Sequence, residues 1–151
     1  MSAFFDTNIL VYAQQTGGKA DQARALLAGG GKLSVQVLNE FTAVSRRKQQ
    51  RDWREIAEAV SDVLTTVEPP LALTLDLHTA ARTLAEDHRL SFYDALIVAT
   101  ALEAGCDTLF SEDLQHGRTI GGLAIVNPFL EAPHERPWAS LPKQGTSRAG
   151  I

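Results

Sequence analysis

Residues 2–13, SAFFDTNILVYA, pass from a short apolar run into a helical pattern, with an aspartate at the change. The run is typical of a buried strand, and the apolar residues that follow recur at helical spacing. Asp6 has two interpretations at this point. It can cap the helix, because aspartate is a preferred N-cap residue. It can also lie at the carboxyl ends of the strands, where open α/β sheets bind ligands.

The alternation of strand and helix patterns continues through most of the chain. The predicted strands cover 3–6, 32–37, 106–113 and 121–129, with a further short strand at the start of 71–89. The predicted helices cover 8–15, 20–32, 36–50, 52–67, the rest of 71–89, and 91–105. Helices that connect strands imply a mainly parallel sheet with both faces covered. The predicted fold class is therefore α/β, a three-layer α/β/α sandwich with a mainly parallel central sheet.

The chain of 151 residues is long enough for one domain with its own core, and 44% of its residues are hydrophobic. We place this domain at 1–130 and interpret the Pro-containing segment 131–151 as a partly disordered tail. The single cysteine, Cys106, excludes an intrachain disulfide and is compatible with a reducing compartment. The sequence shows no signal-peptide pattern and no run of about 18 apolar residues. We therefore predict a cytoplasmic protein that does not associate with membranes.

Four acidic residues follow predicted strands or lie early in the next helix: Asp6, Glu40, Asp94 and Asp113. Each has a structural alternative, since Asp94 lies at capping-box spacing after Ser91 and Asp113 can be a turn residue. Glu40 can be solvated, but on a helical wheel it lies about 80° from the centre of the apolar face, at the border of the core. A carboxylate there needs a partner.

Taken together, the four acids favour a cation site. Like charges collected at one rim repel each other, so the fold must gain something by collecting them. A divalent cation such as Mg²⁺ binds carboxylate oxygens and usually keeps water on its other positions. Asn8 and Ser111 each lie two residues from one of these acids, so they either orient the ligands by hydrogen bonds or serve as ordinary cap or turn residues.

Several motifs in this order resemble the PIN-domain family, in particular its VapC-type toxins of prokaryotic toxin–antitoxin pairs. They are DTN at 6–8, a glutamate in the third helix, YDALIVATAL at 93–102 and LFSEDLQHG at 109–117. The resemblance covers residues 3–127. It implies a compact α/β sandwich, an endoribonuclease dependent on Mg²⁺ or Mn²⁺, a homodimer, and inhibition by a cognate antitoxin. It also suggests a structured tRNA or ribosomal RNA loop as the substrate.

The resemblance places the family's acidic quartet on Asp6, Glu40, Asp94 and Asp113. Glu112 stands between Ser111 and Asp113 and is the competing candidate for the last acid; we favour Asp113. Metal ions can activate water, neutralise the charge of the transition state and assist the leaving oxygen. We predict that Asp6 and Asp94 hold the principal ion and that Asp113 completes the site or binds a second ion. Glu40 would bind through water or help to deprotonate the nucleophile.

A basic segment, RRKQQRDWR at 46–54, stands out in a chain whose net charge is −4. That net charge argues against bulk coating of nucleic acid but allows a local track. We predict that the track binds RNA through Arg46, Arg47, Lys48 and Arg51. The alternative is a solvated helix end, where basic residues complement the helix dipole. Trp53 either stacks on an unpaired base or packs between helices.

Three other functions are consistent with an acidic rim to different degrees. A receiver-type signalling module needs an adjacent acid pair near the first strand and a lysine on a late strand, and the sequence shows neither. A haloacid dehalogenase-type phosphatase needs Asp-x-Asp, and Asn8 stands where the second aspartate belongs. A DNA-directed nuclease stays open, because the same acids would serve either polymer. For the antitoxin, the resemblance suggests a groove formed by 52–64 and the first two helices, with an arginine inserted among the acids.

Overall fold

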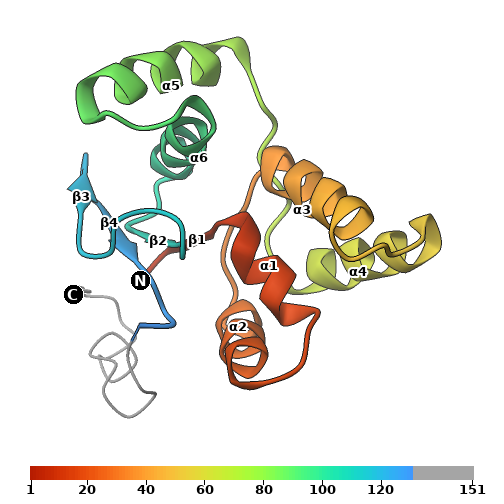
Figure 1. Ribbon diagram of the computed structural model, residues 1–151. Helices are drawn as coiled ribbons and strands as arrows, with labels where there is room; N and C mark the ends of the chain where they lie inside the picture. The colour runs from red at the N-terminus through yellow and green to blue at the C-terminus, as the bar shows by residue number, and fades with distance from the viewer. Residues whose placement is uncertain (131–151) are drawn as a thin grey trace.

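The central sheet follows the predicted parallel arrangement. The structure is a computed structural model and describes residues 1–130; the predicted tail lies outside them (Figure 1). The sheet has the order β1 (Ala3–Phe5), β2 (Thr108–Phe110), β4 (Leu123–Val126) and β3 (Thr119–Ile120). The pairs β1–β2 and β2–β4 are parallel, and β3–β4 is antiparallel. The prediction of a mainly parallel sheet is confirmed.

Six helices of the described part surround this sheet. They are α1 (Thr7–Ala13), α2 (Gly18–Ala28), α3 (Val35–Arg47), α4 (Trp53–Thr66), α5 (Leu75–His88) and α6 (Phe92–Glu103). Helices α5 and α6 pack together on one side of the strands, α1 and α2 lie on the other, and α3 and α4 form a hairpin beside α1 (Figure 1). The α/β sandwich is therefore confirmed.

Two predicted strands are wrong in extent, because capping residues end them early. Within 32–37, only Lys32 and Ser34 form isolated parallel bridges, since Ser34 caps α3 and Val35 already belongs to that helix. Within 71–74, only Leu71 forms a bridge, with Ser34. Both segments still run parallel to β1 and extend the sheet at its edge.

The antiparallel strand β3 is a feature that the sequence prediction missed. It pairs with β4 through the turn Gly121-Gly122, whose φ angles of 56° and 85° fit a type I′ hairpin. The predicted strand at 121–129 consequently begins at Leu123 and ends at Val126. A Gly-Gly pair between two apolar runs was the available signal.

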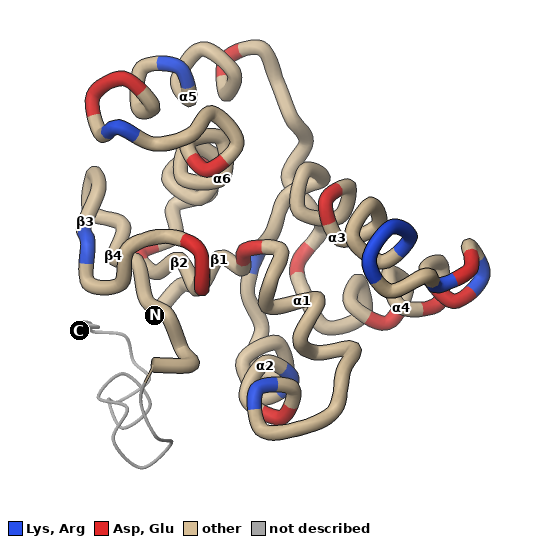
Figure 2. Tube along the Cα trace, viewed as in Figure 1, with Lys and Arg blue, Asp and Glu red and all other residues tan. Residues whose placement is uncertain are grey.

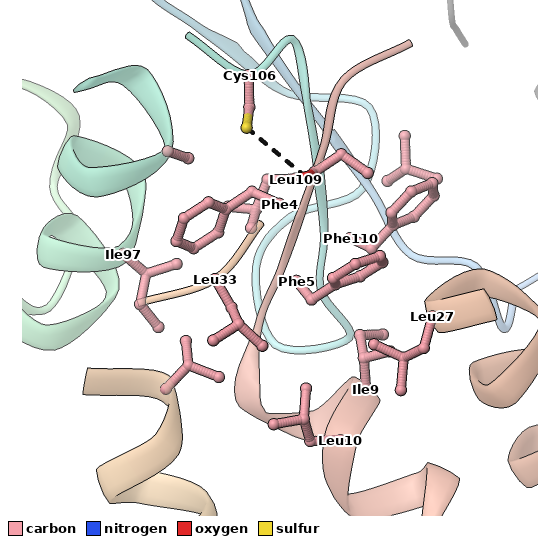
Figure 3. Packing of buried hydrophobic residues seen from close by; sticks show 14 of the residues in the cluster. Phe4, Phe5, Ile9, Leu10, Leu27, Leu33, Ile97, Cys106, Leu109 and Phe110 are labelled. Atoms are coloured by element: carbon pink, nitrogen blue, oxygen red, sulfur yellow. Dashed lines mark hydrogen bonds between the residues drawn. The ribbon is translucent and has the colours of Figure 1, made fainter. Parts of the chain in front are cut away.

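The core lies on both faces of the parallel strands. Phe4 and Phe5 are fully buried, and the ring of Phe5 stacks on Phe110 with centroids 6.1 Å apart (Figure 3). Burial of each such side chain contributes roughly 1.5–3 kcal/mol. Helix α6 is buried without interruption over 95–101, as its apolar sequence predicted. Burial raises the pKa of Cys106 to about 11, and its thiol donates to the carbonyl of Ala3, so this cysteine is a neutral core residue.

Within residues 1–130, the helices are all too short or too polar to cross a lipid bilayer.

Candidate active site

Asp6 lies at the carboxyl end of β1 and caps α1, so both of its sequence interpretations describe its position. Its Oδ1 accepts a hydrogen bond from the Thr7 backbone N–H at 2.7 Å. Its Oδ2 accepts one from the Ser111 hydroxyl at 2.6 Å. The side chain is buried, and its residue is 3% exposed. The cap therefore fixes a carboxylate at the rim of the sheet.

The protonation of Asp6 is strongly affected by this position. Burial is the main cause that raises the pKa of Asp6 to about 6, and the charges of Asp113 and Glu40 act in the same direction. The hydrogen bonds from Ser111 and Thr7 act in the opposite direction and only partly compensate. A carboxylate in this state would be stabilised by a positive charge beside it.

Glu40 approaches from α3 and is held by two side chains. Its Oε1 accepts a hydrogen bond from the Thr7 hydroxyl at 2.7 Å, and its Oε2 accepts one from Gln36 Nε2 at 2.9 Å. Thr7 therefore contacts both Asp6 and Glu40. Glu40 is half-buried, as its place on the helical wheel predicted, and its partners are neutral.

Gln36 connects Glu40 to the start of α6. Its Nε2 also donates to the carbonyl of Tyr93 at 3.2 Å, beside Asp94. The side chain is buried, and its Oε1 has no hydrogen-bond partner among the described residues. Both partners of the side-chain nitrogen Nε2, the Glu40 carboxylate and the Tyr93 carbonyl, are hydrogen-bond acceptors. The NH₂ group of the amide must therefore face them, which fixes the orientation of the side chain. An unpaired buried carbonyl oxygen thus lies next to a candidate ligand.

Asp94 lies in the first turn of α6, where Ser91 is the N-cap. The Ser91 hydroxyl accepts a hydrogen bond from the Asp94 backbone N–H at 3.3 Å, as expected for a cap. The side chain of Asp94 is half-buried. Burial raises the pKa of Asp94, and the charges of Asp113 and Glu40 raise it further. Asp94 and Asp6 therefore interact with the same two acids.

Asp113 follows β2 and is held at the site by the two polar residues singled out in the sequence. Its Oδ2 accepts a hydrogen bond from Asn8 Nδ2 at 3.2 Å, and its backbone N–H donates to the Ser111 hydroxyl oxygen at 3.1 Å. Asn8 Oδ1 also accepts from the Glu112 backbone N–H at 3.1 Å. Ser111 therefore contacts Asp6 and Asp113 at once.

Glu112, the competing candidate for the fourth acid, points to different partners. Its carboxylate forms an ion pair with Lys19 of α2 at 2.7 Å and accepts a hydrogen bond from the Tyr12 hydroxyl at 2.7 Å. Although burial acts in the opposite direction, these two partners lower the pKa of Glu112. Asp113, by contrast, acts on the pKa of Asp6 and Asp94. The geometry favours Asp113 as the member of the acid site.

A cleft of about 630 Å³ runs from Glu40 and Asp113 along α1 and α3, and Asp6 and Asp94 are not part of its lining. Thr7, Glu40 and Asp113 line it together with Arg47 and Lys48, which lie at the end of α3. At 1.5 Å per residue, Arg47 is about 10 Å beyond Glu40 along the helix. Figure 2 shows this separation of charge: acidic segments lie around the ends of β1 and β2, and basic segments gather at the end of α3. The cleft therefore has an acidic and a basic end.

The other two predicted RNA-binding residues lie outside the cleft lining. Helix α3 ends at Arg47, so the predicted continuation to residue 50 is wrong, and Arg51 lies beyond the end of the helix. Gln50 adopts a positive φ of 53° and reverses the chain. Arg46 lies over the ring of Trp53 instead, and Trp53 is exposed and does not pack between helices.

The donor set fits a hydrated hard cation, although the carboxylates do not form a ready cage. Among residues 1–130, no group of three or more His, Cys, Asp or Glu side chains is arranged to hold a metal ion as the structure stands. Mg²⁺, however, is usually bound by one or two carboxylates and retains several waters. The oxygen donors suit Mg²⁺ or Mn²⁺ better than softer metals.

Thr7, Gln36, Lys19 and Tyr12 are the contacts that sequence reasoning missed. Thr7 stands between Asp6 and Asn8 in the DTN motif, and that position was the available signal. Gln36 lies four residues before Glu40, on the same helix face. Lys19 and Tyr12 reach Glu112 across more than 90 positions of sequence, and no local pattern indicates that pairing.

Comparison with known proteins identifies the family. The family model for the PIN domain matches residues 3–120, and the chain belongs to the PIN-domain family. This is a family of nuclease domains that generally use divalent metal ions, and the resemblance read from the sequence motifs is confirmed. No curated protein sequence matches the chain.

Three similar solved structures come from toxin–antitoxin systems. A toxin–antitoxin complex from Klebsiella pneumoniae has a TM-score of 0.65 at 21% identity, covering 85% of this chain and 98% of the other. VapC20 of Mycobacterium tuberculosis, a sarcin-ricin loop cleaving toxin, has a TM-score of 0.60 at 25% identity, covering 74% and 90%. VapBC2 of Rickettsia felis, bound to a DNA fragment from its promoter, has a TM-score of 0.60 at 22% identity, covering 83% and 97%. The first and third likenesses show a shared fold.

Proposed function

We propose that this chain is an endoribonuclease dependent on Mg²⁺ or Mn²⁺ and the toxin of a toxin–antitoxin pair. One observation carries the proposal: Asp6 and Asp94, from two segments far apart in the sequence, both have pKa values raised by burial and by the charges of the same two acids, Asp113 and Glu40. Within residues 1–130, no salt bridge reaches Asp6, Glu40, Asp94 or Asp113. A fold that gathers unpaired acids in this way is destabilised unless a cation joins them.

The residues of the site divide the work of phosphodiester hydrolysis. A cation held by Asp6 and Asp94 would supply Lewis acidity and lower the pKa of a water. Ser111 and the Thr7 backbone N–H orient Asp6. Asp113, oriented by Asn8, completes the site or serves a second ion. Glu40 is held by neutral donors and would accept a proton from the attacking water or bind through water.

The basic end of the cleft supports a polymer with phosphate groups as the substrate. This end, with Arg47 and Lys48, would bind phosphates that flank the scissile bond near Glu40. Sequence-specific proteins mostly recognise RNA in single-stranded loops, where the bases are accessible. The Mycobacterium tuberculosis neighbour cleaves the sarcin-ricin loop. We therefore favour a tRNA or ribosomal RNA loop, which would place the reaction in the cytoplasm.

Two protein partners belong to the proposal. The toxin–antitoxin neighbours support a cognate antitoxin, which would neutralise the acids with an inserted arginine. A homodimer is supported by exposed apolar side chains at the starts of α3, α5 and α6: Val35, Leu73, Leu75 and Tyr93. These segments adjoin each other through the bridge of Ser34 with Leu71 and the bond from Gln36 to Tyr93.

The test compares the parent protein with two variants that each lose one negative charge. Asp6→Asn changes the acid site, and Asp87→Asn changes an exposed residue of α5 as a matched control. All three are incubated with total RNA, with Mg²⁺, with Mn²⁺ and with EDTA. Discrete cleavage by the parent and Asp87→Asn, absent for Asp6→Asn and in EDTA, is the expected result. Equal cleavage by all three proteins would overturn the proposal and indicate a contaminant.

A further inference from the structure

An exposed tryptophan lies at the turn between α3 and α4 and is held in place from two sides. Trp53 is the first residue of α4 and is 63% exposed. A complete capping box fixes the backbone around it, because Asp52 and Glu55 exchange hydrogen bonds of 2.8 and 2.9 Å. The position of the indole is therefore set by local structure, while the core face of α4 is formed by other residues.

Arg46 covers one face of this indole. Its guanidinium carbon lies 4.7 Å from the ring centroid, and its Nη1 donates to the carbonyl of Arg51 at 3.0 Å. A cation–π contact of this kind orients both partners. With Arg46 on one side and 63% of the residue exposed, the opposite face of Trp53 is open to solvent. An open aromatic face held in one orientation is suited to stacking.

Basic residues outnumber the acidic residues Asp52 and Glu55 around Trp53. Arg47 and Lys48 are exposed and lie in the cleft that starts at the acids, and Arg54 follows Trp53 directly. Arg54 reaches its helical neighbour Glu58 only at 3.8 Å, and both side chains are exposed. Proteins bind single-stranded nucleic acid by combining a basic groove with aromatic stacking platforms. The α3–α4 turn carries both features: Arg47 and Lys48 line the cleft, and Trp53 lies beside Arg46, outside the cleft lining.

We propose that Trp53, held by Arg46, stacks on an unpaired RNA base some nucleotides away from the scissile phosphate. The inference rests on the proposed function for its substrate and adds a site outside the catalytic acids. Its consequence is that the enzyme selects RNA loops in which a base is accessible at that distance. Arg46 then acts by positioning Trp53, whereas Arg47 and Lys48 bind phosphates.

The proposal is tested by RNA binding without catalysis. A Trp138→Phe background leaves Trp53 as the only tryptophan of the chain. In EDTA, the fluorescence of Trp53 is followed as a 12-nucleotide single-stranded RNA of mixed sequence is added, and quenching is expected. Dissociation constants are then measured with labelled RNA for the parent, Trp53→Phe, Trp53→Leu and Arg46→Met. Arg82→Met, an exposed charge on α5, is the matched control.

Loss of base stacking should weaken binding by about tenfold in Trp53→Leu, within the range of alanine substitutions at stacking sites. Trp53→Phe should retain most of the affinity. The same oligonucleotide without its bases should bind the parent about tenfold more weakly than the normal RNA does. Trp53→Leu should bind the two oligonucleotides with the same affinity. If the parent cleaves RNA while Trp53→Leu binds both oligonucleotides as the parent does, the proposal is overturned and the indole is left to a protein partner. Absence of cleavage by the parent would overturn the proposed function instead.

Discussion

Asp113 and Glu112 are adjacent acids in opposite environments. Glu112 is paired with Lys19 and Tyr12, and its pKa is lowered. Asp113 faces Asp6 and Asp94 and contributes to raising the pKa of both. The first arrangement resembles an ordinary surface contact between α1, α2 and the loop after β2. The arrangement around Asp113 lowers the stability of the protein, because like charges repel each other. Such a cluster is useful only if a cation or a positively charged group binds there.

The largest expected effect is a gain of stability when the central acid is neutralised. Because the folded-state pKa of Asp6 is about 6 against 3.8 for the unfolded chain, the folded form binds the proton more tightly. The ionised form of Asp6 therefore destabilises the folded protein. This loss of stability is absent below about pH 3.8, where Asp6 is protonated in both states, and complete above about pH 6. Asp6→Asn should therefore stabilise the metal-free protein at pH 7.5 by up to about 3 kcal/mol. Urea unfolding in EDTA measures it.

The pH dependence separates this electrostatic effect from better packing. The stability gain of Asp6→Asn should shrink steadily as the pH falls from 6 towards 4, because the parent aspartate then becomes protonated. A gain that stays constant over this range would contradict the electrostatic explanation. Asp87→Asn, exposed on α5, serves as the control and should change stability by less than about 0.5 kcal/mol at each pH.

The second effect is stabilisation by a divalent cation. A cation that binds the folded protein at 10 to 100 times its dissociation constant should stabilise it by about 1.4–2.7 kcal/mol. Thermal unfolding with MgCl₂ or MnCl₂, against NaCl of equal ionic strength, is the measurement. Glu112→Gln should respond as the parent does, whereas Asp6→Asn should respond little. An equal response of both variants would show that the two acids do not differ as the structure indicates.

The third effect concerns Ser111, which lies between the two regions. The residue is fully buried, donates to Asp6 and accepts from the backbone N–H groups of Asp113 and Leu114. Ser111→Ala leaves these groups without their partner and should destabilise the protein by about 1–3 kcal/mol. It should also raise the pKa of Asp6 further, because a bond that favours the charged form is lost. Urea unfolding and the pH dependence of stability test the two parts.

The sequence allowed much of the fold and the acids to be predicted, since both depend on local patterns. Asp6 and Asp94 carry cap spacings, and α6 is apolar on nearly every face, so these could be recognised along the chain. The extent of the edge strands could not, because Ser34 belongs equally to a strand and to a helix cap. The partners of Glu112 could not either, because they come from helices far away in the sequence.

The smallest effect is expected where the acid is already paired. The side chains of Lys19 and Glu112 are 48% and 27% exposed, and ion pairs of this kind contribute about 0–1 kcal/mol. Lys19→Met and Glu112→Gln should each lower stability within that range and leave RNA cleavage within about threefold of the parent. A double-mutant cycle with both changes measures the coupling by urea unfolding. If Glu112→Gln instead abolished cleavage as Asp6→Asn is expected to do, Glu112 and not Asp113 would be the fourth acid. The contrast between the two neighbours would then have to be reversed.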